Sequence, residues 1–287
     1  MTLPTFFIIG AAKAGTTSLH FYLDQHPEIQ MSAEKEPNFF SGPANGIPYP
    51  LGRVDSLAAY ERLFDARFEV RGEASVGYAN SPRRQGVPER IKELVPDARF
   101  VYVVRDPVAR TVSHYQHRVA AEGERRSLVE ALDDLSDPYS VYLCPSLYAR
   151  QLELYLSVFP AERILVIDQA DLLADREATL REVFSFLSVE ESFDSVQFGD
   201  ELYKGEERRV HPPAYSRLLA PIQSSPLRHL PRGLRRSLRR SVERVLWRPV
   251  PRSELDDELR ARLEQLFGEE VERLRALTGK PFPSWSI

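Results

Sequence analysis

The residues best suited to do chemistry form a short loop near the N-terminus, at 10–18, with the sequence GAAKAGTTS. Small residues let backbone N–H groups close around an anion, and the N-terminus of a following helix adds partial positive charge. We therefore predict a phosphate-binding loop that uses these residues: Lys13, Ala14, Gly15, Thr16, Thr17 and Ser18. The alternative is a turn whose small residues serve only tight packing of a strand against a helix.

The order of residues in this loop differs from that of ATP-binding loops. Those loops place a lysine directly after the second glycine, whereas Lys13 precedes Gly15. A P-loop kinase, which would use ATP and Mg²⁺, is therefore disfavoured and stays as the alternative enzyme.

A second candidate anion site follows the apolar run at 100–104. Arg105 ends this run, and Ser113 follows in a helix that Pro107 is suited to begin. Open parallel sheets bind ligands at the carboxyl ends of their strands. We expect Arg105 to hold a phosphate bidentately, with Ser113 reaching the same group. The alternative is a surface ion pair between Arg105 and Asp106.

Two side chains are candidates for proton transfer. Glu36 lies in the charged run 34–36, just before a Phe–Phe pair that indicates a segment entering the core. His117 follows Ser113 by one helical turn, so it is expected to face the same pocket. The alternatives are a solvated carboxylate and a structural histidine.

Taken in order, these motifs resemble the sulfotransferases that use 3′-phosphoadenosine 5′-phosphosulfate (PAPS). The run that begins at Lys13 is similar to the family's loop for the 5′-phosphosulfate, and Arg105-Asp-Pro with Ser113 is similar to its 3′-phosphate segment. Glu36-Pro-Asn-Phe-Phe resembles the Glu-x-x-Phe-Phe stretch of heparan-type enzymes. The run 207–212 resembles their Lys-Gly-Arg-x-His-Pro nucleotide loop, and the last helix and Trp285 are also similar.

The resemblance implies transfer of a sulfuryl group from PAPS to a hydroxyl or amine of an acceptor, with adenosine 3′,5′-bisphosphate as by-product and without a metal. It implies that Lys13 stabilises the leaving phosphate, that Glu36 is the base and that His117, in a matched Tyr-Gln-His, has an active-site role. Nucleotide contacts are then expected from the phosphate loop and from four further residues: Arg105, Ser113, Arg208 and Arg209.

The acceptor expected from the resemblance is a carbohydrate or a small metabolite. Two positions depart from the heparan-type pattern. Ala74 follows Glu73 where those enzymes carry a lysine, and Glu207 replaces the lysine of the nucleotide loop.

Strands and helices alternate along the chain. Apolar runs predict strands at 6–9, 68–70, 100–104 and 164–167, and helical periodicity predicts helices at 16–25, 86–94, 147–159, 176–187 and 254–277. The alternation predicts a P-loop-like three-layer α/β fold, with a central parallel sheet flanked by helices. We expect a single domain that spans 1–287.

Composition narrows the class of protein. The chain has 287 residues, of which 43% are hydrophobic, enough for a substantial core, and its net charge of −4 gives no support for nucleic-acid binding. Its one cysteine, Cys144, rules out an internal disulfide and a cysteine-rich zinc site. Because no signal peptide or membrane-length apolar stretch is present, we expect a cytoplasmic protein.

The segment 208–252 is strongly basic, with twelve arginines and one acidic residue. Leucine and valine recur every three or four residues within it and predict a basic amphipathic helix. Three interpretations stay open: contact with an anionic acceptor such as an acidic sugar, docking to a carrier protein or an anionic membrane, and a solvated face paired with the acidic remainder of the chain. A nucleotide-binding docking module without catalysis is the second alternative to an enzyme.

Overall fold

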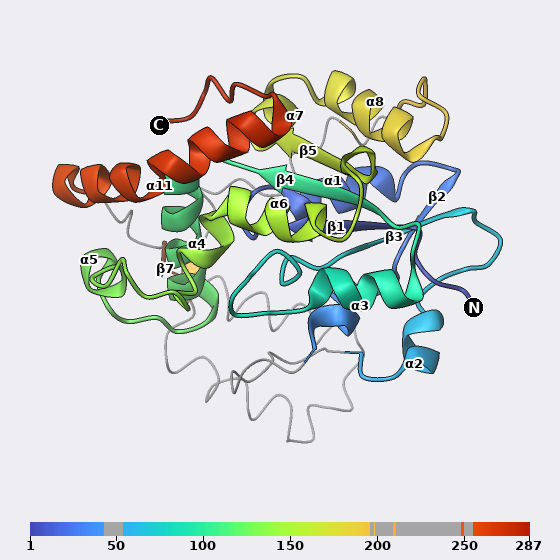
Figure 1. Ribbon diagram of the computed structural model, residues 1–287, viewed down its shortest axis with the longest axis horizontal. Helices are drawn as coiled ribbons and strands as arrows, with labels where there is room; N and C mark the ends of the chain where they lie inside the picture. Colours follow the sequence, from blue (N-terminus) through green and yellow to red (C-terminus); the bar gives the residue numbers. More distant parts are fainter. Residues whose placement is uncertain (43–53, 196–197, 199–208, 211–247, 250–254) are drawn as a thin grey trace.

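Five parallel strands form the central sheet of the computed structural model, which describes residues 1–42, 54–195, 198, 209–210, 248–249 and 255–287 (Figure 1). The sheet order is β2-β3-β1-β4-β5. The strands are β1 (Phe6–Gly10), β2 (Ile29–Met31), β3 (Val70–Ala74), β4 (Arg99–Val104) and β5 (Ile164–Asp168). Their parallel pairing throughout confirms the predicted sheet.

Helices cover both faces of this sheet. In Figure 1, α3 (Val87–Leu94) and α6 (Tyr148–Leu156) lie in front of the strands and α1 (Thr16–Leu23) lies behind them. The long C-terminal helix α11 (Asp257–Thr278) packs on α6. Helix α8 (Arg176–Leu187) lies on the same face of the sheet as α1. The ring centroid of its Phe184 is 4.6 Å from that of His26, which follows α1. The predicted three layers are therefore confirmed.

The remaining elements are short, apart from α4. They are α2 (Leu57–Glu61), α4 (Pro107–Ala121), α5 (Leu128–Ala131), α7 (Gln169–Ala174), three 3₁₀ turns (Phe39–Ser41, Cys144–Ser146, Ala161–Arg163) and an antiparallel pair, β6 (Arg209–Val210) with β7 (Arg248–Pro249). In the described part of the chain, no helix combines the length and apolarity that crossing a membrane requires.

The core is built around the two central strands. Every residue of β1 and all but the first of β4 are buried, as expected for strands covered on both faces. The ring of Phe7 stacks on Phe100 at 5.7 Å, and Phe159 meets Phe100 edge-on at 4.6 Å. A smaller cluster joins α4, α5 and α11. The carboxyl ends of β1 and β4 therefore project from strands that are packed on both faces.

The strand predicted at 68–70 is displaced in the structure, where β3 begins at Val70 and continues to Ala74. Gly72 lies inside the strand because the ring of Phe6 occupies the place of a side chain, and an added Cβ would lie 2.1 Å from its Cζ. This glycine therefore allows a close approach and does not end the strand. The basic helix predicted within 208–252 lies outside the described residues.

Candidate active site

The predicted phosphate loop joins β1 to α1 at the carboxyl edge of the sheet. Lys13 and Gly15 both have left-handed backbones, with φ of 71° and 98°. Gly15 is the N-cap of α1, and glycine has no side chain that could occupy the N–H groups of the first turn. These donors are thus able to meet an anion, next to the hydroxyl groups of Thr16, Thr17 and Ser18.

Two arginines hold the carbonyl groups of this loop. Arg105 donates from Nη1 to the Lys13 carbonyl at 3.3 Å, and Arg110 donates from Nη1 to the Ala12 carbonyl at 3.2 Å. Carbonyl oxygens would repel an anion, and here two consecutive ones are turned toward guanidinium groups. Because carbonyl and N–H point in opposite directions in a planar peptide, the Lys13 N–H faces away from Arg110.

Arg110 lies on α4 and is fully buried. It was not among the site residues predicted from the sequence. It donates to the Ser146 hydroxyl at 2.5 Å and to the Tyr142 carbonyl, and its Nη1 lies 3.3 Å from Nδ1 of His114. Within the described residues it forms no ion pair. Burial lowers the pKa of Arg110 to about 10, so the group stays cationic at neutral pH. The available signal was its position three residues before Ser113, on the same helix face.

Arg105 is half-buried and lies between the end of β4 and the start of α4. Burial lowers the pKa of its guanidinium, and the Tyr148 hydroxyl donates to its carbonyl at 2.8 Å. The neighbouring Asp106 caps α4 by accepting from the Ala109 N–H at 2.7 Å. The geometry thus differs from the alternative of an Arg105–Asp106 surface pair. Ser113 lies on the buried side of the same helix.

The two candidates for proton transfer lie on separate segments. Glu36 precedes the 3₁₀ turn Phe39–Ser41, and its side chain is 37% exposed and 2.8 Å from Nζ of Lys35. His117 lies in the last third of α4, half-exposed, with Nε2 4.0 Å from Oε1 of Glu122. The hydrogen bond from Arg105 to the Lys13 carbonyl joins the two predicted nucleotide motifs, whereas Glu36 lies in the segment beside β3.

The second nucleotide-loop candidate lies beside α4. Arg208 falls outside the described residues, and Arg209 begins β6, where its backbone pairs with Pro249 of β7. Strand β6 is next to α4, the helix that carries Ser113 and His117. The backbone of the predicted nucleotide loop therefore reaches the predicted 3′-phosphate segment.

Asp168 ends β5, where a Mg²⁺-dependent kinase would use a carboxylate. Its Oδ1 accepts from the Ala170 N–H at 3.0 Å, and its Oδ2 accepts from Nε1 of Trp285 at 2.9 Å. Both oxygens thus serve the cap of α7 and the anchoring of the C-terminal Trp285. The described residues hold no group of three His, Cys, Asp or Glu side chains placed to bind a metal ion.

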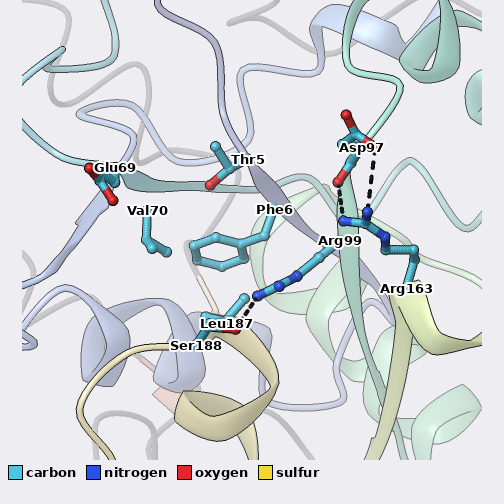
Figure 2. Close-up of a pocket in the computed structure, with 9 residues that line it drawn as sticks. All are labelled: Thr5, Phe6, Glu69, Val70, Asp97, Arg99, Arg163, Leu187 and Ser188. Atoms are coloured by element: carbon cyan, nitrogen blue, oxygen red, sulfur yellow. Dashed lines mark hydrogen bonds and ion pairs between the residues drawn. The ribbon is translucent and has the colours of Figure 1, made fainter.

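A pocket of about 310 Å³ lies at the opposite, amino edge of the sheet (Figure 2). Two arginines line it, and both have partners from the chain itself. Nη1 of Arg163 donates to the Asp97 carbonyl at 2.9 Å, and its Nη2 lies 3.4 Å from the Asp97 carboxylate. Arg99 donates to the Ser188 hydroxyl at 3.0 Å.

The comparisons with known proteins agree with the predicted family and with the sheet. The model of the sulfotransferase family matches residues 51–194, about half of the chain. The chain belongs to the sulfotransferase family. A solved sulfotransferase from Alicyclobacillus acidocaldarius superposes on this sulfotransferase with a TM-score of 0.72 and 28% identity, covering 100% of both chains. The predicted family and fold are confirmed.

Curated relatives match part of this sulfotransferase. The bifunctional heparan sulfate N-deacetylase/N-sulfotransferase 2 of Bos taurus is 30% identical over 207 residues, which cover 65% of this chain and 22% of that protein. The membrane-associated sulfotransferase kil1 of Dictyostelium discoideum is 32% identical over 120 residues, 42% of this chain and 24% of that one. The chain thus spans about a fifth of the length of the first of these relatives.

Proposed function

We propose that this sulfotransferase transfers a sulfuryl group from PAPS to a hydroxyl or amine of an acceptor and releases adenosine 3′,5′-bisphosphate. The observation that carries the proposal is the loop around Lys13, in which two carbonyls accept hydrogen bonds from the half-buried Arg105 and the fully buried Arg110. In the reaction a bond forms from the acceptor atom to sulfur, and the bond from sulfur to the phosphate oxygen breaks. The acceptor's proton passes to a base, and negative charge develops on the leaving phosphate.

The residues of the site divide these tasks. Lys13 stabilises the leaving phosphate, Glu36 takes the acceptor's proton, and His117 acts on the acceptor side. Arg105 and Ser113 bind the 3′-phosphate, with Arg208 and Arg209 closing on the nucleotide. The partial exposure of Glu36 supports its role, because a base must meet a substrate that enters from solvent.

The acceptor is proposed to be a carbohydrate or a small metabolite. The relatives named for heparan sulfate support the sugar, and the twelve arginines of 208–252 support an anionic one. Docking of that segment to a carrier protein or an anionic membrane, and the cytoplasmic location, stay predictions of the sequence.

The test of the base is Glu36→Gln. Release of adenosine 3′,5′-bisphosphate is followed with PAPS and a glucosamine-containing oligosaccharide, which offers hydroxyl and amine acceptors together. We expect turnover to fall by about 10²- to 10⁴-fold, with affinity for adenosine 3′,5′-bisphosphate unchanged. Glu153→Gln, which alters an exposed ion pair with Arg273 on the outer helices, serves as the matched control at native turnover. Native turnover in Glu36→Gln would overturn the assignment of the base.

A further inference from the structure

Glu73 is a carboxylate buried in the sheet with only neutral donors around it. It lies in β3, is fully buried, and receives three hydroxyl hydrogen bonds. Tyr60 and Tyr78 each donate to Oε1 at 2.7 Å, and Ser75 donates to Oε2 at 3.1 Å. Among the described residues no lysine, arginine or histidine contacts it. Burying a charge without a counter-charge is unfavourable, so its presence here calls for a role.

The hydroxyl groups around Glu73 also hold the segment that carries Glu36. The Ser75 oxygen accepts from the Asn38 N–H at 3.1 Å, and the Tyr78 oxygen accepts from the Phe40 N–H at 3.2 Å. The Glu36 N–H donates to the Ala74 carbonyl at 3.0 Å. Every second N–H of the segment 36–40 is therefore tied to β3 or to the turn after it, and two of these three bonds pass through hydroxyls that donate to Glu73.

This segment needs such support, because its backbone is strained. Glu36 has φ of 61° and Asn38 has φ of 54°, both in the left-handed region. Asparagine tolerates that region, but a glutamate rarely adopts it. The Phe39 ring also stacks on Tyr60 at 4.3 Å, so a donor to Glu73 packs on the segment as well.

We propose that Glu73 is a positioning residue that sets the direction of the Ser75 and Tyr78 hydroxyls and so fixes the Glu36 carboxylate for proton transfer. This inference rests on the proposed role of Glu36. An ionised carboxylate can only accept hydrogen bonds, so both hydroxyls must donate to it. Their lone pairs are then left facing the Asn38 and Phe40 N–H groups. A protonated Glu73, or a glutamine, presents a donor on one side and forces a hydroxyl to turn.

The surroundings of Glu73 shift its ionisation toward neutral pH. Burial raises the pKa of Glu73 to about 7, although the three hydroxyl bonds act in the opposite direction. The titratable groups that face it are Tyr60 of α2, Tyr78 of the turn after β3 and Tyr155 of α6, beyond which lie Glu89 and Arg90 of α3. Burial raises the pKa of all three tyrosines above their usual range, so they keep their protons.

This pKa shift has opposite consequences for stability and for activity. Because the pKa of Glu73 is raised on folding, its stabilising contribution is present below the unfolded value of 4.5 and is lost as pH rises through about 7. The ionised form that the positioning role requires is therefore the less stable one. Glu73→Gln is expected to unfold at pH 8 at a temperature equal to or above that of the native chain, while its turnover falls.

Three variants test the proposal, each with a matched control. They are Glu73→Gln, Ser75→Ala and Tyr78→Phe, and the controls, on exposed residues away from the site, are Glu153→Gln, Ser157→Ala and Tyr139→Phe. We expect hydrogen exchange to accelerate in peptides covering 36–41 in the three variants and to stay native in peptides covering 13–19. Unchanged exchange at 36–41 in all three variants would overturn the positioning role of Glu73.

Turnover of PAPS with the glucosamine-containing oligosaccharide gives the second readout. We expect kcat to fall about 10²-fold in Glu73→Gln and less in the other two variants, because small displacements of a catalytic group have effects of this size. Affinity for adenosine 3′,5′-bisphosphate should not change. The native pH profile should lose activity as pH falls through about 7, and Glu73→Gln should lack that step.

The outcomes separate this inference from the proposed base. If Glu36→Gln is inactive while Glu73→Gln retains native kcat and the native pH step, Glu36 is the base and the positioning role of Glu73 is wrong. If Glu36→Gln retains native turnover, the assignment of Glu36 as the base is wrong, whatever the behaviour of the Glu73 variant. The exchange measurement then still reports whether Glu73 holds the segment 36–40.

Discussion

Arginines lie at both edges of the sheet, and they are used differently there. At the amino edge, Arg163 is 34% exposed and paired with Asp97, and Arg99 reaches the Ser188 hydroxyl (Figure 2). At the carboxyl edge, Arg105 is half-buried and Arg110 is fully buried. Both donate to the loop of Lys13, and neither forms an ion pair within the described residues. The first edge has a pocket and one arginine that is paired with a carboxylate, and the second has two arginines without a carboxylate partner among the described residues.

This difference supports the proposal that the carboxyl edge holds the functional site. An exposed arginine with a carboxylate partner is a common surface feature that contributes little to stability. A buried guanidinium without a carboxylate is unfavourable to keep, and an anionic ligand bound beside it compensates for that. In this protein, a buried arginine without a carboxylate partner among the described residues is therefore a better indicator of an anion-binding site than the volume of a pocket.

The largest effect is expected at the loop lysine. Lys13→Ala removes the cation that we propose for the leaving phosphate, and we expect turnover of PAPS to fall by about 10²- to 10³-fold. The measurement is steady-state release of adenosine 3′,5′-bisphosphate. Lys92→Ala, which changes a lysine on α3 that packs on Phe159, is the control expected to retain native turnover. Equal losses in both variants would contradict the account.

A smaller effect, on stability, is expected at Arg110. Arg110→Lys keeps the charge, but its three donors share one nitrogen and lack the planar fork that reaches Ser146, Tyr142 and Ala12 together. We expect the free energy of unfolding in urea to fall by about 3 kcal/mol, since buried acceptors are left unsatisfied. Arg273→Lys, at an exposed ion pair on α11, should change it by less than about 1 kcal/mol. Similar losses in both would sharply weaken the contrast between buried and exposed arginines.

The smallest effect is expected at the amino edge. Arg163→Ala removes the partner of Asp97, and its unfolding free energy should fall by no more than about 1 kcal/mol. Calorimetric affinity for adenosine 3′,5′-bisphosphate should equal that of the native chain. A loss of affinity in this variant would show that the pocket of Figure 2 takes part in binding.

Local patterns were enough to predict the frame of the site. The loop of Lys13 and the position of Arg105 depend on strands that end within a few residues of them, and these strands are marked by apolar runs. Four of the five strands and the longer helices were predicted from such patterns, but the three-residue strand β2 was not. The strand predicted at 68–70 lies at 70–74 in the structure. It continues through Gly72, which makes room for the ring of Phe6, a residue distant in the sequence.

The supporting residues could not be predicted in this way. Arg110 meets Ser146 across 36 positions, and Ser75 meets Asn38 across 37. Such contacts depend on which strands become neighbours, and no local spacing encodes that. In the sequence, Glu73 was notable only for the alanine that follows it. Its role as an acceptor for three hydroxyls appears once α2 and the turn after β3 are folded against the strand.

The central claim is that the carboxyl edge, around Lys13 and Arg105, binds the sulfuryl donor. The most direct test is calorimetric titration of the native chain and of Arg105→Ala with adenosine 3′,5′-bisphosphate, with ATP and Mg²⁺ in a parallel titration. We predict micromolar binding of the bisphosphate by the native chain, weakened at least about tenfold in Arg105→Ala, which corresponds to about 1.4 kcal/mol. Tight binding of ATP with Mg²⁺ and none of the bisphosphate would contradict the account and favour a kinase.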